Sequence, residues 1–132
     1  PIIENLRTLV ENLMNAEPHH QREEQILFTE MEKIGISGPT SVMRSEHTGF
    51  RSYKADLHEL LTTFSENDMN EVVLKIEKLT GILIEYLSSH IYKENNILYP
   101  MAHRAIQDQE HWSNMQTNSD QNIGPCNFKD IP

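Results

Sequence analysis

Two short segments of this sequence place a histidine and a glutamate four residues apart. One is HHQREEQILF, which holds His19 and Glu23, and the other is HIYKENNILY, which holds His90 and Glu94. In both segments an Ile-Leu-aromatic triplet follows at the same distance, so the segments align as near-copies. Residues four positions apart share one face of a helix, where an imidazole nitrogen and a carboxylate oxygen can bind the same cation.

The second pair falls on a helix face that is otherwise apolar. Steps of three and four connect it to Val72, Val73, Ile76, Leu79, Leu83, Tyr86, Leu87, Ile97 and Met101. A carboxylate that points into an apolar interior is costly unless it is paired or bound to a metal, and two facing carboxylates repel each other. Two cations bridged by the carboxylates would remove both costs. Imidazole and carboxylate ligands suit iron, manganese or zinc, and the lack of available thiolates argues against a structural zinc site.

A third histidine, His47, lies between the two copies in the sequence. It follows Met43 by four residues and precedes Phe50 by three, which places it on the inner face or the edge of its helix. His58 lies three helical turns further on, and we expect it at the surface. The candidate metal ligands are therefore His19, Glu23, His47, His90 and Glu94.

The first copy leaves a choice between two neighbouring pairs. Alignment of the Ile-Leu-aromatic triplets selects His19 and Glu23, whereas the phase of the apolar residues that follow selects His20 and Glu24. We favour the aligned pair and expect the other pair on a solvated helix face.

Hydrophobic periodicity predicts three long helices that position these residues. The first covers about residues 2–34, and Pro18 either bends it or divides it near Glu17. The second covers about residues 40–64, and the third about residues 69–106, with Pro100 near its end. Strand-like alternation is missing, so the sequence predicts an all-α, up-down helical bundle with three long helices, or four where Pro18 breaks the first.

The composition limits the class of protein further. A chain of 132 residues suits a single domain over residues 1–132, and we expect residues 107–132 to form a C-terminal tail that packs on the bundle. The net charge of −9 argues against a nucleic acid or an anionic membrane as the main partner. The single cysteine, Cys126, fits a reducing cytoplasm. No apolar run approaches the roughly 20 residues that span a bilayer, and no signal peptide is visible.

Together these motifs resemble the hemerythrin-like, HHE cation-binding domains. The similarity is greatest to bacterial versions in di-iron proteins of iron–sulfur cluster repair and in domains linked to sensory modules. The resemblance implies a four-helix bundle around a non-haem di-iron centre, with His19, His47 and His90 as terminal ligands and Glu23 and Glu94 as bridges. It is carried by residues 19–28, 38–47, 90–101 and 123–126.

Two departures from the family pattern affect the expected site. Members of the family usually take a histidine from a first helix, and residues 1–17 contain none. Either that helix lies upstream, since the chain starts at Pro1 without a methionine, or the site is incomplete; a second copy of the chain in a homodimer could also complete the bundle. Oxygen carriers of the family have a second histidine four residues after the one matching His47, where this chain has Arg51. A guanidinium cannot ligate a cation, so reversible oxygen carriage is disfavoured and an open position is expected.

The resemblance favours a di-iron module that senses or handles oxygen, nitric oxide or iron, with such a diatomic molecule as its small partner. Repair of iron–sulfur clusters is the alternative use of the same site. No feature of the sequence assigns an enzymatic activity to either use. A metal-free structural bundle is the third reading, and the missing first-helix histidine is its best support.

Overall fold

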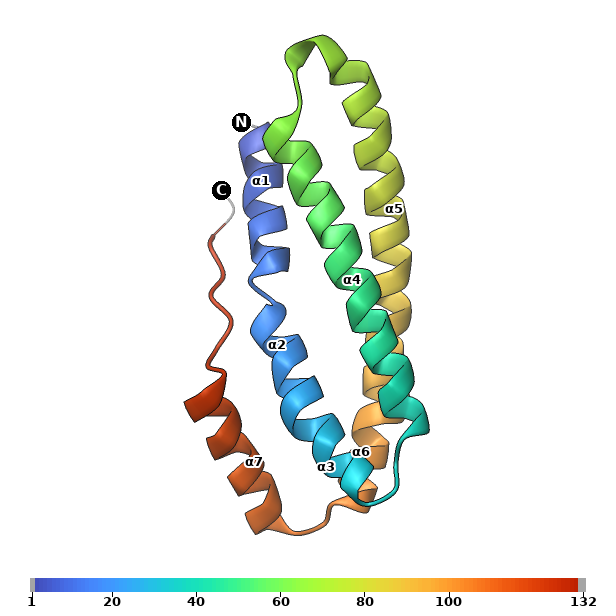
Figure 1. The fold of residues 1–132 in the computed structure, drawn as a ribbon, viewed down its shortest axis with the longest axis vertical. Coiled ribbons are helices and arrows are strands. Elements are labelled where there is room, and N and C mark those ends of the chain that lie inside the picture. The colour runs from blue at the N-terminus through green and yellow to red at the C-terminus, as the bar shows by residue number, and fades with distance from the viewer. Residues whose placement is uncertain (1, 131–132) are drawn as a thin grey trace.

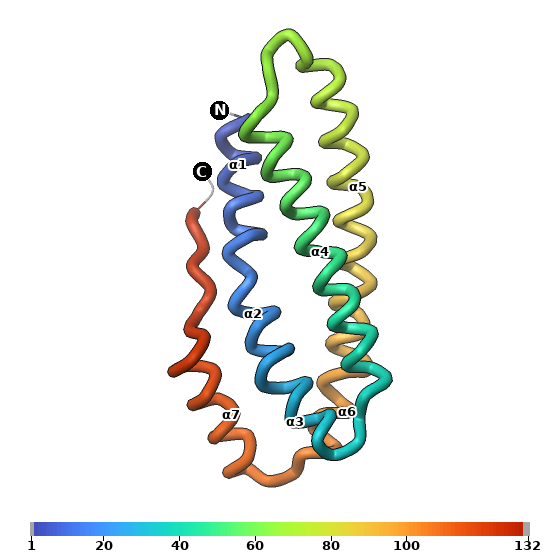
Figure 2. The backbone as a smooth tube through the Cα atoms, in the orientation of Figure 1, coloured from blue at the N-terminus to red at the C-terminus, as the bar shows by residue number. Residues whose placement is uncertain are grey.

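The computed structural model describes residues 2–130, and these residues form an all-α bundle without strands. Three helical columns run side by side along its long axis (Figure 1). The columns alternate in direction, because short connections join them at opposite ends (Figure 2). The predicted all-α helical bundle is therefore confirmed.

The first column is divided close to the proline. Helix α1 covers Ile2–Met14, and α2, Glu17–Arg22, restarts the column with Pro18 in its first turn. A proline is tolerated there, because the amide it lacks would have no partner within the helix. The column continues through a π-helical turn, η1 (Glu23–Leu27), into α3 (Phe28–Lys33).

The second and third columns follow the predicted boundaries closely. Helix α4 covers Gly38–Thr63, and the short 3-10 turn η2, Glu66–Asp68, leads into the third column. That column consists of α5 (Met69–Lys93), a second π-helical turn η3 (Glu94–Leu98) and α6 (Tyr99–Ala105). Pro100 lies in the first turn of α6, so the helix passes through it.

The C-terminal segment differs from the sequence-based expectation, because it contains a helix. Helix α7 covers Gln109–Asn122 and begins with the side chain of Asp108, which accepts a hydrogen bond from the Glu110 amide at 3.0 Å. It lies beside α2 and α3, and the chain then returns along α1 (Figures 1 and 2). Too few apolar residues occur in this polar segment for its periodicity to reveal a helix.

Two hydrophobic clusters enclose a polar centre in the bundle. The buried members of the lower cluster are Ile26, Phe28, Met31, Met43, Leu98, Ala102, Ile106 and Met115. Those of the upper cluster are Val10, Phe50, Leu57, Leu61 and Leu83. Phe28 stacks on His47 with ring centroids 5.7 Å apart, and Phe50 meets His90 edge-on at 4.8 Å. The histidines therefore lie at the junction of the clusters.

None of the helices in residues 2–130 combines the length and apolar character that crossing a membrane requires.

Candidate metal centre

Four buried side chains from all three columns converge on one point. They are Glu23 from η1, His47 from α4, His90 from α5 and Glu94 from η3, and each offers a ligand atom within 4.8 Å of the others. The two glutamates come from the aligned segments, whereas His47 comes from the helix between them. The structure thus brings together four of the five residues that the sequence selected.

Both glutamates begin a π-helical turn. The Phe28 amide donates to the Glu23 carbonyl, and the Tyr99 amide donates to the Glu94 carbonyl, each five residues back. Such turns are rare and often occur at functional sites. They also change which residues face inward: Leu98 is 1% exposed, whereas Ile97, expected on the apolar face, is 45% exposed. The expectation for Ile97 was wrong because the wider turn advances the buried face by one residue.

Each central histidine is oriented by a carboxylate on its outer nitrogen. His47 Nδ1 lies 3.1 Å from Glu24 Oε1, and His90 Nδ1 lies 2.7 Å from Glu46 Oε2. Burial would raise the pKa values of both carboxyls, but cationic and imidazole partners lower them overall. Ionised carboxylates only accept hydrogen bonds, so both histidines carry a proton on Nδ1. Metal-binding histidines are commonly held in this way.

Two basic residues complete these connections. Arg51 donates from Nη1 and Nη2 to the two oxygens of Glu24, each at 2.8 Å, and also contacts Glu17 at 2.7 Å. On the other side of the centre, Lys93 donates from Nζ to Oε1 of Glu46. The expected solvated position of Glu24 is therefore wrong, because Arg51 and His47 hold it inside the bundle. Glu46 belongs to the segment that carries the family resemblance, but sequence reasoning gave it no role at the site.

The inner nitrogens of the two histidines face each other. His47 Nε2 and His90 Nε2 are 3.2 Å apart, and His90 Nε2 is 2.9 Å from Glu94 Oε1. Burial and the charge of His90 lower the pKa of His47 to about 4, so its Nε2 presents a lone pair. Burial alone would lower the pKa of His90, but Glu94 and Glu46 raise it. A positive charge is needed between these nitrogens, and either a proton or a metal cation can supply it.

The carboxylates of Glu23 and Glu94 also favour a bound cation at this point. Both oxygens of Glu23 are buried and accept no hydrogen bond of good geometry, and burial raises the pKa of this carboxyl. Burial would also raise the pKa of Glu94, but His19 and His90 lower it overall. A buried carboxylate whose hydrogen bonds are poorly formed is expensive, and a bound cation would remove that cost. The donor set of two imidazoles and two carboxylates suits iron, manganese or zinc.

His19 lies on the outer side of the carboxylate pair. Its Nε2 is 2.9 Å from Glu23 Oε1 and 3.5 Å from Glu94 Oε1, and its side chain is 46% exposed. Glu23 and then Glu94 raise its pKa to about 10. The structure thus places His19 against both carboxylates, but half-exposed to solvent, unlike the two buried central histidines.

His20 is not on a solvated face, contrary to the expectation. It is buried, and its ring centroid is 4.4 Å from that of His47. Its Nε2 lies 3.0 Å from Nζ of Lys54, and its Nδ1 is buried without a partner among the described residues. Burial and the charge of Lys54 lower its pKa to about 2, so this imidazole is neutral. His58 is exposed, as expected.

Comparisons with known proteins agree with this geometry. The family model "Hemerythrin HHE cation binding domain" matches residues 2–102. A curated relative, the iron-sulfur cluster repair protein YtfE of Escherichia coli O157:H7, is 40% identical over 97 residues, covering 64% of this chain and 40% of the relative. The chain therefore spans well under half of that relative's length. No solved structure matches the chain significantly. The chain belongs to the hemerythrin family of HHE cation-binding domains.

Proposed function

We propose that this protein holds two non-haem irons between its three helical columns. His47 and His90 would hold one ion and His19 the other, with the carboxylates of Glu23 and Glu94 between them. The observation that carries the proposal is the pair of inner histidine nitrogens, 3.2 Å apart, beside a buried carboxylate whose oxygens accept no hydrogen bond of good geometry. Membership of a cation-binding family and similarity to an iron–sulfur cluster repair protein support iron.

The surrounding residues make the two positions unequal. Glu24 and Glu46 fix the histidine tautomers on the inner side, where Phe28 and Phe50 exclude water. The outer position has one imidazole, and the half-exposed His19 leaves it accessible. When bound, iron supplies a redox-active centre with room for a small exogenous ligand.

We infer that the centre senses or handles oxygen, nitric oxide or iron through this accessible position. The test is to load the protein with ferrous iron without oxygen, and then to add nitric oxide or oxygen while recording the visible spectrum. New charge-transfer bands are expected, and they should be lost in Glu94→Gln but kept in Glu85→Gln, an exposed residue of α5. Iron-loaded protein whose spectrum does not respond to either gas would refute this function.

Repair of iron–sulfur clusters is the second candidate, because a relative carries that name. The matched region covers 40% of the relative, so the repair activity of the whole relative is not transferred to this chain. A direct assay is to mix the iron-loaded protein with an enzyme whose iron–sulfur cluster has been damaged and to measure recovery of that enzyme. Recovery beyond that given by free iron alone would favour repair over sensing.

A further inference from the structure

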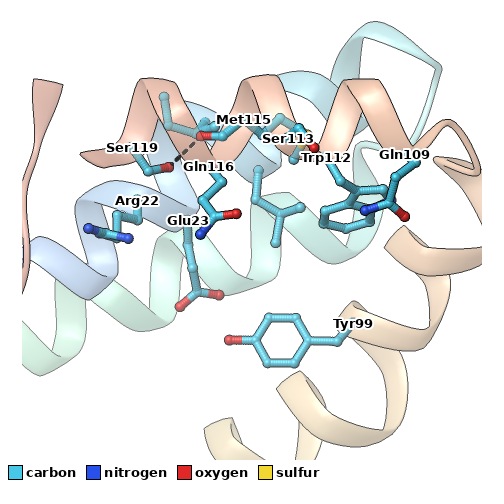
Figure 3. Close-up of a pocket in the computed structure, with 11 residues that line it drawn as sticks. Arg22, Glu23, Tyr99, Gln109, Trp112, Ser113, Met115, Gln116 and Ser119 are labelled. Atoms are coloured by element: carbon cyan, nitrogen blue, oxygen red, sulfur yellow. Dashed lines mark hydrogen bonds between the residues drawn. The ribbon is translucent and has the colours of Figure 1, made fainter. Parts of the chain in front are cut away.

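A cavity of about 380 Å³ opens between α7 and the outer side of the centre. Its walls come from η1, α6 and α7, and Glu23 forms part of its inner end (Figure 3). Apolar walls are provided by Ile26, Leu27, Trp112 and Met115. The cavity is therefore a largely apolar space whose wall includes Glu23, with the buried carboxylate oxygens of that residue directly behind the wall.

Tyr99 places a hydroxyl group at this inner end. Its ring lines the cavity, and its oxygen points toward the carboxylate of Glu23 (Figure 3). Burial and then the Glu23 and Glu94 carboxylates raise the pKa of Tyr99, so its hydroxyl keeps its proton, and no hydrogen bond of good geometry ties it to Glu23. A donor is thus held beside the centre, available to another acceptor.

The two aligned segments differ at this position by a single hydroxyl group. Phe28 is the equivalent of Tyr99, and it is fully buried against His47, where it has no polar atom. Packing of an aromatic ring after the Ile-Leu pair therefore requires no hydroxyl. The hydroxyl of Tyr99 occurs on the side of the centre that faces the cavity.

The cavity offers hydrogen bonds rather than a free positive charge. Arg22 lies at its edge, but it donates to the Gly124 carbonyl and to Asp120, each at 3.0 Å. Gln116 adds a side-chain amide to the wall. Apolar walls with one or two neutral donors favour a small neutral molecule that has an oxygen or nitrogen acceptor.

We propose that this cavity admits a small neutral ligand to the centre, and that the Tyr99 hydroxyl donates the hydrogen bond that holds it beside Glu23. The proposal rests on the metal centre described under Proposed function. Tyr99 is then a residue that determines ligand retention, and it is not one of the residues that hold the metal.

The first test uses nitric oxide as the probe on iron-loaded protein. Tyr99→Phe removes only the hydroxyl, and Tyr92→Phe is the matched control because Tyr92 is exposed on α5. We expect Tyr99→Phe to keep the iron, to shift the N–O stretching frequency of the bound probe and to release it about tenfold faster, as loss of one hydrogen bond predicts. Tyr92→Phe should match the parent protein in all three measurements.

The outcomes separate this inference from the proposed function. Failure of the parent protein to retain iron would refute the metal centre itself. If iron is retained but Tyr99→Phe gives the parent's stretching frequency and release rate, only the role of Tyr99 is wrong. Loss of iron from Tyr99→Phe would also overturn the inference, because it would make the residue part of the metal-holding set.

The second test addresses the route by which the ligand enters the cavity. Ser113 lies on the cavity wall, whereas its neighbour Asn114 is exposed on α7 and does not line the cavity. Ser113→Phe should slow association of nitric oxide about tenfold or more by blocking the opening, and Asn114→Phe should leave the rate unchanged. Equal association rates in the two variants would show that the ligand enters elsewhere.

Discussion

At the scale of single residues, each central histidine divides its two nitrogens between different tasks. The outer nitrogen of His47 or His90 donates to Glu24 or Glu46, and the inner nitrogen faces the centre. The two carboxylates are in turn held by Arg51 and Lys93. The same order, a base, a carboxylate and an imidazole, thus occurs on both sides of the centre.

The first prediction concerns Glu46. Glu46→Gln removes the ionised acceptor that fixes the His90 tautomer, so affinity for ferrous iron should fall about 10- to 100-fold while the helical content is kept. Metal titration monitored by circular dichroism and by bound iron measures both quantities. Glu85→Gln, an exposed change on the same helix as His90, should bind iron like the parent. If the Glu46→Gln variant binds ferrous iron as tightly as the parent, this carboxylate does not support the site.

A second prediction at this scale follows from the raised pKa of His19. Because Glu23 and Glu94 raise that pKa to about 10, the imidazole is protonated at neutral pH and must lose its proton before it binds a cation. Metal affinity should therefore rise with pH, being higher at about pH 8 than at about pH 6, with protons released on binding. Calorimetry in buffers of different ionisation enthalpy measures the release. Binding that is independent of pH would exclude His19 as a ligand.

The sequence identified the residues that are marked by a repeated segment or by the phase of their apolar neighbours. His19, Glu23, His90 and Glu94 belong to repeated segments, and His47 lies in phase with apolar neighbours. Glu46 carries no such signal, and Glu24 has only the phase of the apolar residues that follow it, since acidic residues are common on solvated helix faces. Their role depends on which basic residue faces them from another column, and that is a property of the folded bundle.

At the scale of elements, the two π-helical turns decide which residues face the centre. A continuous α-helix through the third column would bury Ile97, whereas the observed turn buries Leu98. Steps of three and four fit both arrangements in a short segment, so the sequence pattern does not distinguish a π turn from an α turn. The repeat was visible in the sequence, but the geometry that both copies adopt was not.

The third prediction tests this turn. Deleting Asn96, an exposed residue within η3, removes the extra residue that the five-residue hydrogen bond encloses. The helices on both sides should remain in register, so the circular dichroism spectrum should be preserved while iron affinity falls at least tenfold through misdirection of Glu94. Deleting Asn67 from the loop turn η2, far from the centre, is the comparison. Equal iron affinity in the two deletions would mean that the π turn does not position the ligand.

At the scale of the whole molecule, the three columns were predictable and the fourth segment was not. The columns carry long apolar faces with clear stops, such as Gly35 at a φ of 93° after α3. Helix α7 has a polar sequence and is fixed by a few contacts instead. Arg22 donates to Asp120 of α7 at 3.0 Å, and beyond the helix Asn12 pairs with the Lys129 backbone at 2.8 and 2.7 Å. Such contacts between distant residues leave no periodic signal.

The fourth prediction links the metal to the stability of the bundle. A ligand that binds only the folded state stabilises it, by about 2.7 kcal/mol at a concentration 100 times the dissociation constant. Iron loading should therefore raise the thermal midpoint, and a chelator should lower it again. The double variant Glu23→Gln/Glu94→Gln should show no such shift, although its metal-free midpoint should be at least that of the parent, because two facing carboxylates are removed. If iron leaves the thermal midpoint of the parent protein unchanged, the metal does not stabilise the fold and this prediction is wrong.

The central claim is that five side chains, His19, Glu23, His47, His90 and Glu94, hold two iron ions. The most direct measurement is the number of irons retained per chain after anaerobic loading and removal of free metal, determined by elemental analysis together with Mössbauer spectroscopy. We predict close to two irons per chain with the signature of a coupled pair, and near-complete loss in the double variant Glu23→Gln/Glu94→Gln. A parent protein that retains no iron, or a double variant that retains as much as the parent, would contradict the account and leave a metal-free helical bundle.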